Sequence, residues 1–490
     1  MGDDDTRPTL SAADTPDLER AFEAAVATVL DCNVVPGRGA HEPRLYLRAG
    51  GGYPEPWTRD AAINALQAGA PLCPDVARDT LTMVCDHDDD GAPIIARDNQ
   101  WWDSIIWVLG AWRSYLVTGD EDFLEKAFGI GVRSLAGLRA RRFDPRRGLF
   151  EGPAVMQDGI SGYPDDLVDA ARASTHSFVL DHPATHRIAC LSTNLVYLRA
   201  HRELLAMADE LDRLVRPSAR SGPPRPGFRS TPSARRALSD DADALATAIE
   251  RTFWDPVLGR YRFLNYPDGR VDASQEGLGL AFAALAADDE RAAAVVTGAH
   301  RQPRGVVNLW PHVQGYSDDR PGRHNALLWP MVMGFWAQAV ARTRDEALFG
   351  QALGDIVSLV AGSGFDFFET YDAVTGAPHG GWQTGAEWES QRDQTWSATA
   401  YIGAVVEGLI GIRFLPCGLA IQPLVPPGTG PVALRNLRYR HALLTVDIRG
   451  HGATIWSIRR DGVPINPDAV AVPADATGPV TVEIELRPER

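Results

Sequence analysis

The sequence has few cysteines and lacks long hydrophobic runs. Its 490 residues include only five cysteines, widely spaced and without a CxxC pair, which is typical of reduced thiols rather than of a disulfide framework or a zinc site. No stretch approaches the roughly 18 consecutive apolar residues of a membrane-spanning helix. The acidic start, MGDDDTRPTL, has no apolar core of the signal-peptide kind. These absences predict a cytoplasmic protein that does not enter a membrane.

Positive charge is also scarce. Lys and Arg number 48 against 64 Asp and Glu, a formal net charge of −16, which argues against nucleic acid or anionic lipid as a partner. Phosphate-binding GxxxxGK loops, GxGxxG turns, HExxH zinc motifs, GxSxG nucleophile elbows and calcium-binding DxDxDG loops are absent or unconvincing. The sequence therefore predicts a small neutral or cationic ligand, and neither a cofactor nor a metal. It leaves the oligomeric state open.

Helical periodicity dominates the chain up to about residue 412. Apolar residues recur at 3.6-residue spacing in several segments, each of which is predicted to form a helix. These segments include residues 104–118, 193–208, 242–253, 288–300, 328–342 and 397–409. The loops between them are long and rich in Gly, Pro, Trp and charged residues. Loops of that length in a compact domain are more often functional than simple connections.

Two segments break the helical pattern. Residues 216–236 are basic, rich in Pro and Ser and poor in apolar residues, which predicts a mobile surface excursion. After Gly418 apolar and polar residues alternate, as at Leu444, Val446 and Ile448, which predicts a small β-region. The chain is thus predicted to be mainly α, with helices paired in a closed barrel. A helical solenoid is the competing architecture, although no repeat of fixed period is present.

Residues 382–409 interleave carboxylates with tryptophans and then continue into a long apolar helix. Tryptophan faces stack on the C–H faces of sugar rings, while charged and amide side chains bind the hydroxyl groups, so this mixture is typical of a sugar pocket. Glu387, Trp388 and Trp396 belong to it. A charged helix N-terminus with ordinary buried aromatic residues gives the same pattern, so the segment alone does not choose between the two.

Other loops also carry an acidic residue beside Trp, Gly or Arg. They include residues 57–60, 101–103, 156–159 and 368–371. Glycoside hydrolysis requires two opposed carboxyl groups, one protonated to donate to the leaving oxygen and one ionised to activate water or attack carbon. The loops supply several carboxylates in places that suit this chemistry.

Five blocks of sequence, in a fixed order, carry a resemblance to a known family. They are GGYPEPWTRDAAINA (51–65), RDNQWWDSIIW to TGDEDFL (97–124), FEGPAVMQDGISGYP with LSTNLVYLRA (150–200), GRHNALLWP (322–330) and FFETYDAVTGAPHGGW to QTWSATAYIGAVVEGLIGI (367–412). The chain resembles the (α/α)6-barrel, or six-hairpin, glycosidases of glycoside hydrolase families 63 and 37, a group that contains bacterial α-glucosidases, mannosylglycerate hydrolases and trehalases. With the change of periodicity, the resemblance implies an N-terminal lead-in over 1–45, an (α/α)6-barrel catalytic domain over 46–415 and a C-terminal β-region over 416–490.

The resemblance implies an exo-acting, inverting α-glycosidase, an α-glucosidase for short oligosaccharides or small glucosides. Asp158, in QDGISGYP, matches the family's general acid, and Glu369, in ETYDAVTG, matches its general base. The acid would protonate the glycosidic oxygen while the base draws a proton from water attacking the opposite face. Other readings exist: Asp158 also suits an Asp-Gly turn, Glu369 also suits a loop ion pair, and Glu387 is the rival base.

The same resemblance implies a set of substrate-binding residues. They are Trp57, Arg59, Asp60, Gln100, Trp102, Asp103, Asn325, Trp329, Trp382, Glu387 and Trp396. Other roles compete for several of them: an ion pair at a helix start for Arg59 and Asp60, an N-cap for Asp103, and core packing for the tryptophans. The block GRHNALLWP departs from the corresponding trehalase motif, which argues against trehalose as the substrate.

Two other functions fit parts of the pattern. A sugar epimerase or isomerase on a helical barrel would use paired histidines as acid and base near neutral pH. The sequence contains His176, His182, His186, His312 and His324. None of these histidines falls in a recognised pairing motif. A non-catalytic carbohydrate-binding barrel would have the pocket without the opposed acid and base.

Overall fold

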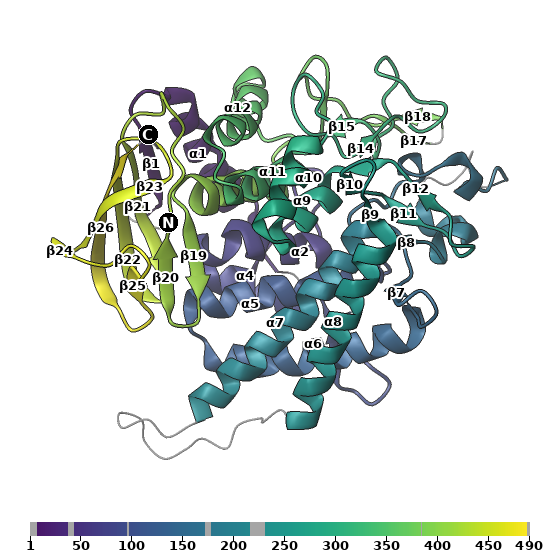
Figure 1. Cartoon of the computed structure of the whole chain (residues 1–490), viewed down its shortest axis with the longest axis horizontal. Coiled ribbons are helices and arrows are strands. Elements are labelled where there is room, and N and C mark those ends of the chain that lie inside the picture. Colours follow the sequence, from purple (N-terminus) through teal and green to yellow (C-terminus); the bar gives the residue numbers. More distant parts are fainter. Residues whose placement is uncertain are drawn as a thin grey trace.

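The computed structural model describes residues 7–37, 44–95, 98–171, 178–215, 231–383 and 385–487. Helices dominate the described chain up to residue 409, and β-strands form most of the described chain beyond it (Figure 1). No helix among these residues is both long enough and apolar enough to cross a lipid bilayer. The prediction of a mainly α protein whose last segment is β is confirmed.

Six helices of the described chain contact one another in sequence order. They are α2 (Thr58–Asn64), α5 (Trp107–Thr118), α7 (Leu191–Val215), α9 (Gly277–Ala286), α11 (Pro330–Arg342) and α13 (Thr395–Gly403). Each packs on the next, and α13 returns to pack on α2. Nearly all residues of α2, α11 and α13 are buried, including the polar residues of α2, so these helices lie inside the molecule. We call these six the central helices.

Two glycines let neighbouring central helices approach closely. A Cβ atom at Gly110 of α5 would stand 2.7 Å from the backbone oxygen of Ala62 in α2. A Cβ atom at Gly334 of α11 would stand 2.6 Å from the backbone oxygen of Ala400 in α13. Any larger residue at either position would therefore push the two helices apart, and close-packed interiors tolerate such shifts poorly.

A second set of helices packs against the central ones. In chain order they are α1 (Pro16–Ala27), α4 (Pro74–Met83), α6 (Glu121–Arg142), α8 (Pro232–Phe253), α10 (Asp289–Gly298) and α12 (Glu346–Gly362). Asp120, Asp288 and Asp345 cap α6, α10 and α12, because each side chain accepts a hydrogen bond from a backbone N–H in the first turn. Five of the six segments predicted as helices from their apolar spacing lie in one of the two sets, to within a few residues. The sixth, residues 397–409, begins in α13 and continues as a π-helix over Ala404–Leu409.

Helix α8 begins earlier than its apolar spacing indicated. The side chain of Thr231 accepts a hydrogen bond from the backbone N–H of Ala234, so residues 232–236 are helical. The predicted surface excursion is therefore wrong over these residues, because an N-cap and good helix formers extend the helix where no apolar face is present. The rest of the predicted excursion, residues 216–230, lies outside the described residues.

The C-terminal sheet has the strand order β1-β21-β22-β26-β23-β24 among the described residues. Its strands are β1 (Thr9–Ala12), β21 (Val432–Tyr439), β22 (His441–Arg449), β23 (Thr454–Arg460), β24 (Val463–Pro464) and β26 (Thr477–Arg487). The alternation predicted around Leu444 is confirmed by its buried face. Strand β1 pairs with β21 (Figure 1), and α1 packs on α13. The start of the chain thus contacts both sheet and helices, and the boundaries at residues 45 and 416 stay predictions.

Candidate active site

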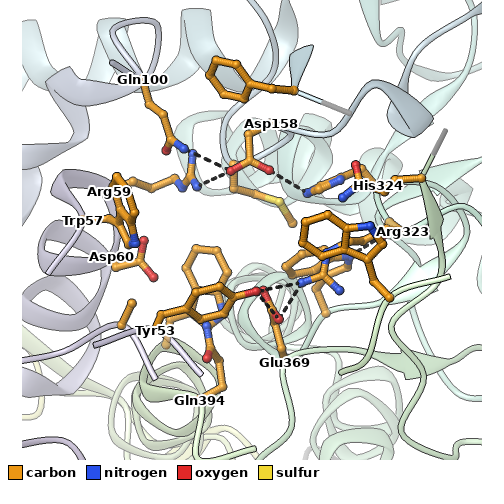
Figure 2. A pocket seen from close by; sticks show the side chains of 17 residues that line it. Tyr53, Trp57, Arg59, Asp60, Gln100, Asp158, Arg323, His324, Glu369 and Gln394 are labelled. Carbon is orange, nitrogen blue, oxygen red and sulfur yellow. Dashed lines mark hydrogen bonds and ion pairs between the residues drawn. The ribbon is translucent and has the colours of Figure 1, made fainter. Parts of the chain in front are cut away.

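A cavity of about 280 Å³ lies where three central helices begin. Trp57, Trp329 and Gln394 stand immediately before the first residues of α2, α11 and α13, and all three line the cavity. Figure 2 shows the polar side chains that converge on it from several segments. The lining side chains that carry the argument are Tyr53, Trp57, Arg59, Asp60, Gln100, Asp158, Arg323, His324, Trp329, Glu369, Gln383, Trp388, Gln394 and Trp396.

Asp158 lies on one side of the cavity, and three side chains bond to it (Figure 2). Arg59 Nη2 and Gln100 Nε2 each donate to Oδ2 at 3.1 Å, and His324 Nε2 lies 3.2 Å from Oδ1. Burial favours the neutral acid, but the bond to His324 and the charge of Arg59 outweigh it and hold the pKa of Asp158 below its ordinary value. The side chain is still 30% exposed. Asp158 is therefore fixed in place yet open to a ligand.

Asp103 supports this side of the cavity from behind. Its Oδ2 accepts hydrogen bonds from Arg59 Nη1 at 3.0 Å and from the backbone N–H of Met156 at 2.9 Å. Met156 has a φ of 63°, so the chain turns sharply just before Asp158. The backbone oxygen of Asp158 then accepts from the N–H of Val179 at 2.7 Å. Asp103 thus positions both the guanidinium and the loop that carries Asp158.

Glu369 lies across the cavity from Asp158 (Figure 2). Its Oε2 accepts hydrogen bonds from Arg323 Nη2 at 2.6 Å and from the Tyr53 hydroxyl at 3.2 Å. Arg323 is itself anchored, because its Nη1 donates to the backbone oxygen of Gly380 at 3.0 Å. Glu369 is only 4% exposed. A short charge-assisted hydrogen bond of this kind fixes the position of the carboxylate.

Asp60 is a third carboxyl group at the cavity. It lies in the first turn of α2, is 4% exposed and makes no hydrogen bond or ion pair with any described residue. Burial raises the pKa of Asp60 to about 7. An unpaired carboxyl group in this position is suited to binding the hydroxyl groups of a ligand. Within the described chain, no three His, Cys, Asp or Glu side chains gather as a metal ion would require.

The structure brings most of the predicted site residues to this one cavity. Those that line it are Trp57, Arg59, Asp60, Gln100, Asp158, Trp329, Glu369 and Trp396. Arg59 combines two of the roles that the sequence left open, since it pairs with Asp103 as a structural ion pair and also reaches Asp158.

Three other predicted site residues are buried behind the cavity and do not line it. Asp103 bonds to Arg59 from behind. Trp102 is fully buried, and its Nε1 donates to the backbone oxygen of Ala154 at 2.8 Å. Asn325 is also fully buried and bonds to His312. The structure thus places all three behind the cavity, where packing uses the same residue types as a sugar pocket, and their contact with substrate stays a prediction.

Two further predicted site residues lie outside the cavity. Trp382 stacks beneath Arg320, whose guanidinium carbon is 4.6 Å from the ring centre. Glu387, the rival base, is half exposed and pairs with His379 Nε2 at 3.3 Å. Both residues belong to a short hairpin, in which β17 (Trp382–Gln383) pairs with β18 (Ala386–Glu387). Alternation along these strands turns neighbouring side chains in opposite directions, and here it is Gln383 that reaches the cavity.

Several cavity residues were not assigned to substrate by the sequence. They are Tyr53, Arg323, Gln383 and Gln394, together with His324, which the sequence offered only as a histidine of an isomerase. Trp388, which belongs to the tryptophan-rich segment typical of a sugar pocket, also lines the cavity. Tyr53, Arg323 and His324 lie inside two of the blocks that carry the resemblance, GGYPEPW and GRHNALLWP. Their polar side chains inside these blocks are the feature from which the sequence could have predicted them as site residues.

Comparison with known proteins identifies the family of the chain. Residues 53–397 match the family model of the mannosylglycerate hydrolase MGH1-like glycoside hydrolase domain. No curated protein matches the chain. Among solved structures, the family 63 mannosylglycerate hydrolase from Thermus thermophilus in complex with glucose is similar over 78% of this chain and 99% of that chain, with 17% identity and a TM-score of 0.55.

Two longer proteins also share the fold. A sialidase is similar over 94% of this chain, with 14% identity and a TM-score of 0.66, and the chain spans 40% of its length. The family 78 rhamnosidase of a Bacillus species is similar over 98% of this chain, with 14% identity and a TM-score of 0.52, and the chain spans 44% of its length. At these identities the likeness concerns the fold alone.

The chain has a mainly α fold, opposed carboxylates in a tryptophan-lined cavity, and a match to a glycosidase family over most of its length. Together these features define a glycoside hydrolase. The chain belongs to the mannosylglycerate hydrolase MGH1-like glycoside hydrolase family. The predicted resemblance to the six-hairpin glycosidases of family 63 is thereby confirmed.

Proposed function

We propose that the chain is an exo-acting, inverting α-glycosidase whose paired helices form an (α/α)6 barrel. Asp158 acts as general acid and Glu369 as general base. The observation that carries this proposal is the placing of the two carboxylates on opposite sides of one cavity, each held by an arginine. The contacts that return from α13 to α2 support the closed barrel.

The surroundings of each carboxylate suit its part in the reaction. Glu369 is held at the cavity by Arg323 and Tyr53, where it can take a proton from water that attacks the anomeric carbon. Asp158 faces the cavity and can give a proton to the glycosidic oxygen. A volume of about 280 Å³ lies just below the roughly 300–1,000 Å³ typical of ligand pockets. This small volume supports attack at the end of a chain rather than in its middle.

The charges around the cavity favour an uncharged leaving group. Arg59 and Arg323 are the arginines that line it within the described chain, and each is already paired with a carboxylate, as is His324 when its ring is protonated. A leaving group with its own carboxylate, such as glycerate, would therefore find no unpaired cation there to bind. We propose an α-glucoside of a second sugar or of a small polyol as the substrate.

Proton NMR of the purified protein with a panel of α-glycosides tests this function. The panel contains glucose disaccharides and matched pairs of glucosyl- and mannosyl-glycerol with the corresponding glycerates. We expect early release of the β-anomer, and faster release from the glycerol member of each pair. Early release of the α-anomer would contradict the inverting mechanism. Equal or faster release from the glycerates would contradict the proposed uncharged leaving group.

The same panel separates the two alternative functions. An epimerase or isomerase would convert a sugar without releasing one, and among the described residues His324 is the histidine that lines the cavity, without a second one to pair with it. A non-catalytic binding protein would bind sugar equally well before and after Asp158→Asn and would release none. If the chain is a hydrolase, Asp158→Asn should retain binding and lose release.

A further inference from the structure

Two buried polar atoms beside Asp158 have no hydrogen-bond partner. They are His324 Nδ1 and Gln383 Oε1. Both side chains are almost completely buried, at 2% and 3% exposed. A buried polar atom without a partner carries a free-energy cost, so each such atom in a folded protein needs an explanation. The other ring nitrogen of His324 faces Asp158.

The two atoms lie beside each other, next to Gly159. A Cβ atom at Gly159 would stand 1.8 Å from Gln383 Oε1 and 2.3 Å from His324 Nδ1. Since both distances start from one point, the two atoms can be no further apart than these distances combined. The φ of Gly159 is −97°, which any residue can adopt, so it is the space rather than the backbone that requires glycine. The residue after the general acid thus leaves room for the two side chains to meet.

We propose that His324 is a positioning residue that carries the proton delivered by Asp158, and that Gln383 holds His324 in the required tautomer. This inference rests on the proposed function and deepens it. If Nδ1–H donates to Gln383 Oε1, then Nε2 is left to exchange one proton with Asp158 Oδ1, which lies 3.2 Å away. Both buried atoms are then satisfied.

One proton passes through the pair in each turnover. The protonated ring breaks its Nε2–H bond, the electron pair stays on Nε2, and an O–H bond forms on Asp158 Oδ1. Asp158 then gives the proton to the glycosidic oxygen, which keeps the electron pair of the breaking bond to carbon. Glu369 meanwhile takes a proton from the attacking water. Exchange with bulk water removes this proton from Glu369 and returns one to Nε2, so nothing is oxidised or reduced.

The surroundings favour transfer to Asp158 when a ligand is bound. The charged groups near His324 are Asp158, Arg59, Arg323 and Glu369. Burial lowers the pKa of His324 despite the bond to Asp158, so the ring gives up its proton readily. Because Asp158 is 30% exposed, a sugar placed beside it removes water from the carboxylate. Loss of water favours the neutral pair of acid and imidazole over the ion pair.

The test compares His324→Gln with the wild type on two leaving groups. Glutamine keeps an N–H donor for Asp158 but cannot carry a proton. With an alkyl glycoside, which needs an acid, kcat should fall about 10²-fold, as is typical for the loss of acid catalysis, with little change in KM. With the glycosyl fluoride of the same sugar, whose leaving group needs little acid, kcat should stay near the wild-type value. An equal loss on both substrates, or no loss on either, would overturn the proposal.

Two further variants check the specificity of that result. His312 bonds to Asp318 outside the cavity, so His312→Gln is the matched control and should behave like the wild type on both substrates. Gln383→Leu removes the acceptor for Nδ1–H, so it should move the alkaline limb of the pH profile of kcat/KM to lower pH. Gln383→Glu should move the same limb to higher pH. If neither variant moves this limb, the role of Gln383 is wrong.

Nitrogen-15 NMR of labelled histidine tests the tautomer without turnover. The His324 signals, assigned by their loss in His324→Gln, should show a protonated Nδ1 in the neutral ring and an Nε2 that responds to Asp158→Asn. A neutral ring with its proton on Nε2 would contradict the proposal. Failures remain distinguishable, since a wild type that releases no sugar removes the proposed function. An active wild type with an equal loss on both substrates removes only the role of His324.

Discussion

The two sides of the cavity hold their carboxylates in different ways. Asp158 is partly exposed and bonds to an arginine, a glutamine and His324, whereas Glu369 is buried and bonds to Arg323 and Tyr53. Arg323 and His324 are neighbours in the sequence, yet each serves a different carboxylate (Figure 2). Histidine exchanges protons near neutral pH and arginine does not. The difference matches the proposed roles, because an acid must be reprotonated in every turnover while a base must start each one ionised.

The largest effect is expected on the Glu369 side. Glu369→Gln keeps the shape and a hydrogen-bonding group but removes the proposed base, so kcat should fall about 10³-fold, within the range for general acid–base groups. The loss should be the same for alkyl glycosides and glycosyl fluorides, because both need an activated water. Steady-state kinetics on the two substrates measure it. Glu387→Gln, at the half-exposed rival base, is the matched control, and an equal loss there would reverse the assignment.

The arginine on the same side gives the next effect. Arg323→Met leaves Glu369 buried without its charged partner, and breaking a buried pair in this way costs about 3 kcal/mol or more of stability. Chemical unfolding of the two proteins measures this cost. The activity of the variant should also fall further at acidic than at alkaline pH, because an unpaired buried carboxylate takes up a proton.

Arg320 provides the control for that experiment. It stacks on Trp382 outside the cavity, so Arg320→Met should change stability by much less than Arg323→Met. Comparable losses in the two variants would mean that the bond to Glu369 is not what stabilises this side.

A further effect concerns Asp60, the third carboxyl group at the cavity. Burial raises its pKa to about 7 in the folded protein, against about 3.9 in the unfolded chain. Between about pH 4 and pH 7 the folded state therefore binds more protons than the unfolded state, so this group lowers the free energy of unfolding as pH rises. The loss is about 1.4 kcal/mol for each pH unit within this window, and it is complete above it.

Asp60→Asn should remove this pH dependence. Unfolding at several pH values should show the variant gaining stability over the wild type as pH rises through the window, and no further gain above about pH 7. Asp243→Asn, at an exposed position on α8, is the control and should follow the wild type. A constant difference between Asp60→Asn and the wild type at all pH values would show that Asp60 ionises normally.

Local patterns predicted the secondary structure well where one face of an element is apolar. The spacing of apolar residues found α5 and the alternation found β22, because burial of one face repeats with the period of the element. The spacing of apolar residues did not predict the start of α8, since its first turns are exposed and depend on the cap at Thr231. The resemblance located both proposed catalytic residues, Asp158 and Glu369, but it did not separate residues that touch the cavity from those that support it.

Tryptophans and glutamates show why that separation failed. Trp57 lines the cavity whereas Trp102 is buried in the core, although each stands beside an acidic motif. Glu369 faces the cavity whereas Glu387 lies outside it, although each stands in a loop rich in aromatic residues. The residue type is the same in each pair and the neighbours are of the same kinds, so residue type and local composition do not distinguish them.

By itself the sequence determined the mainly α class, the β-strands near the C-terminus, the family and the two carboxylates on which the proposed chemistry depends. It could do so because periodicity and short motifs are properties of neighbouring residues. Only the tertiary structure decided that His324 meets Asp158 and Gln383 beside Gly159, and that Tyr53 and Arg323 meet Glu369. These contacts join segments that are far apart in the chain. Their distances depend on how the central helices pack, and no single segment specifies that packing.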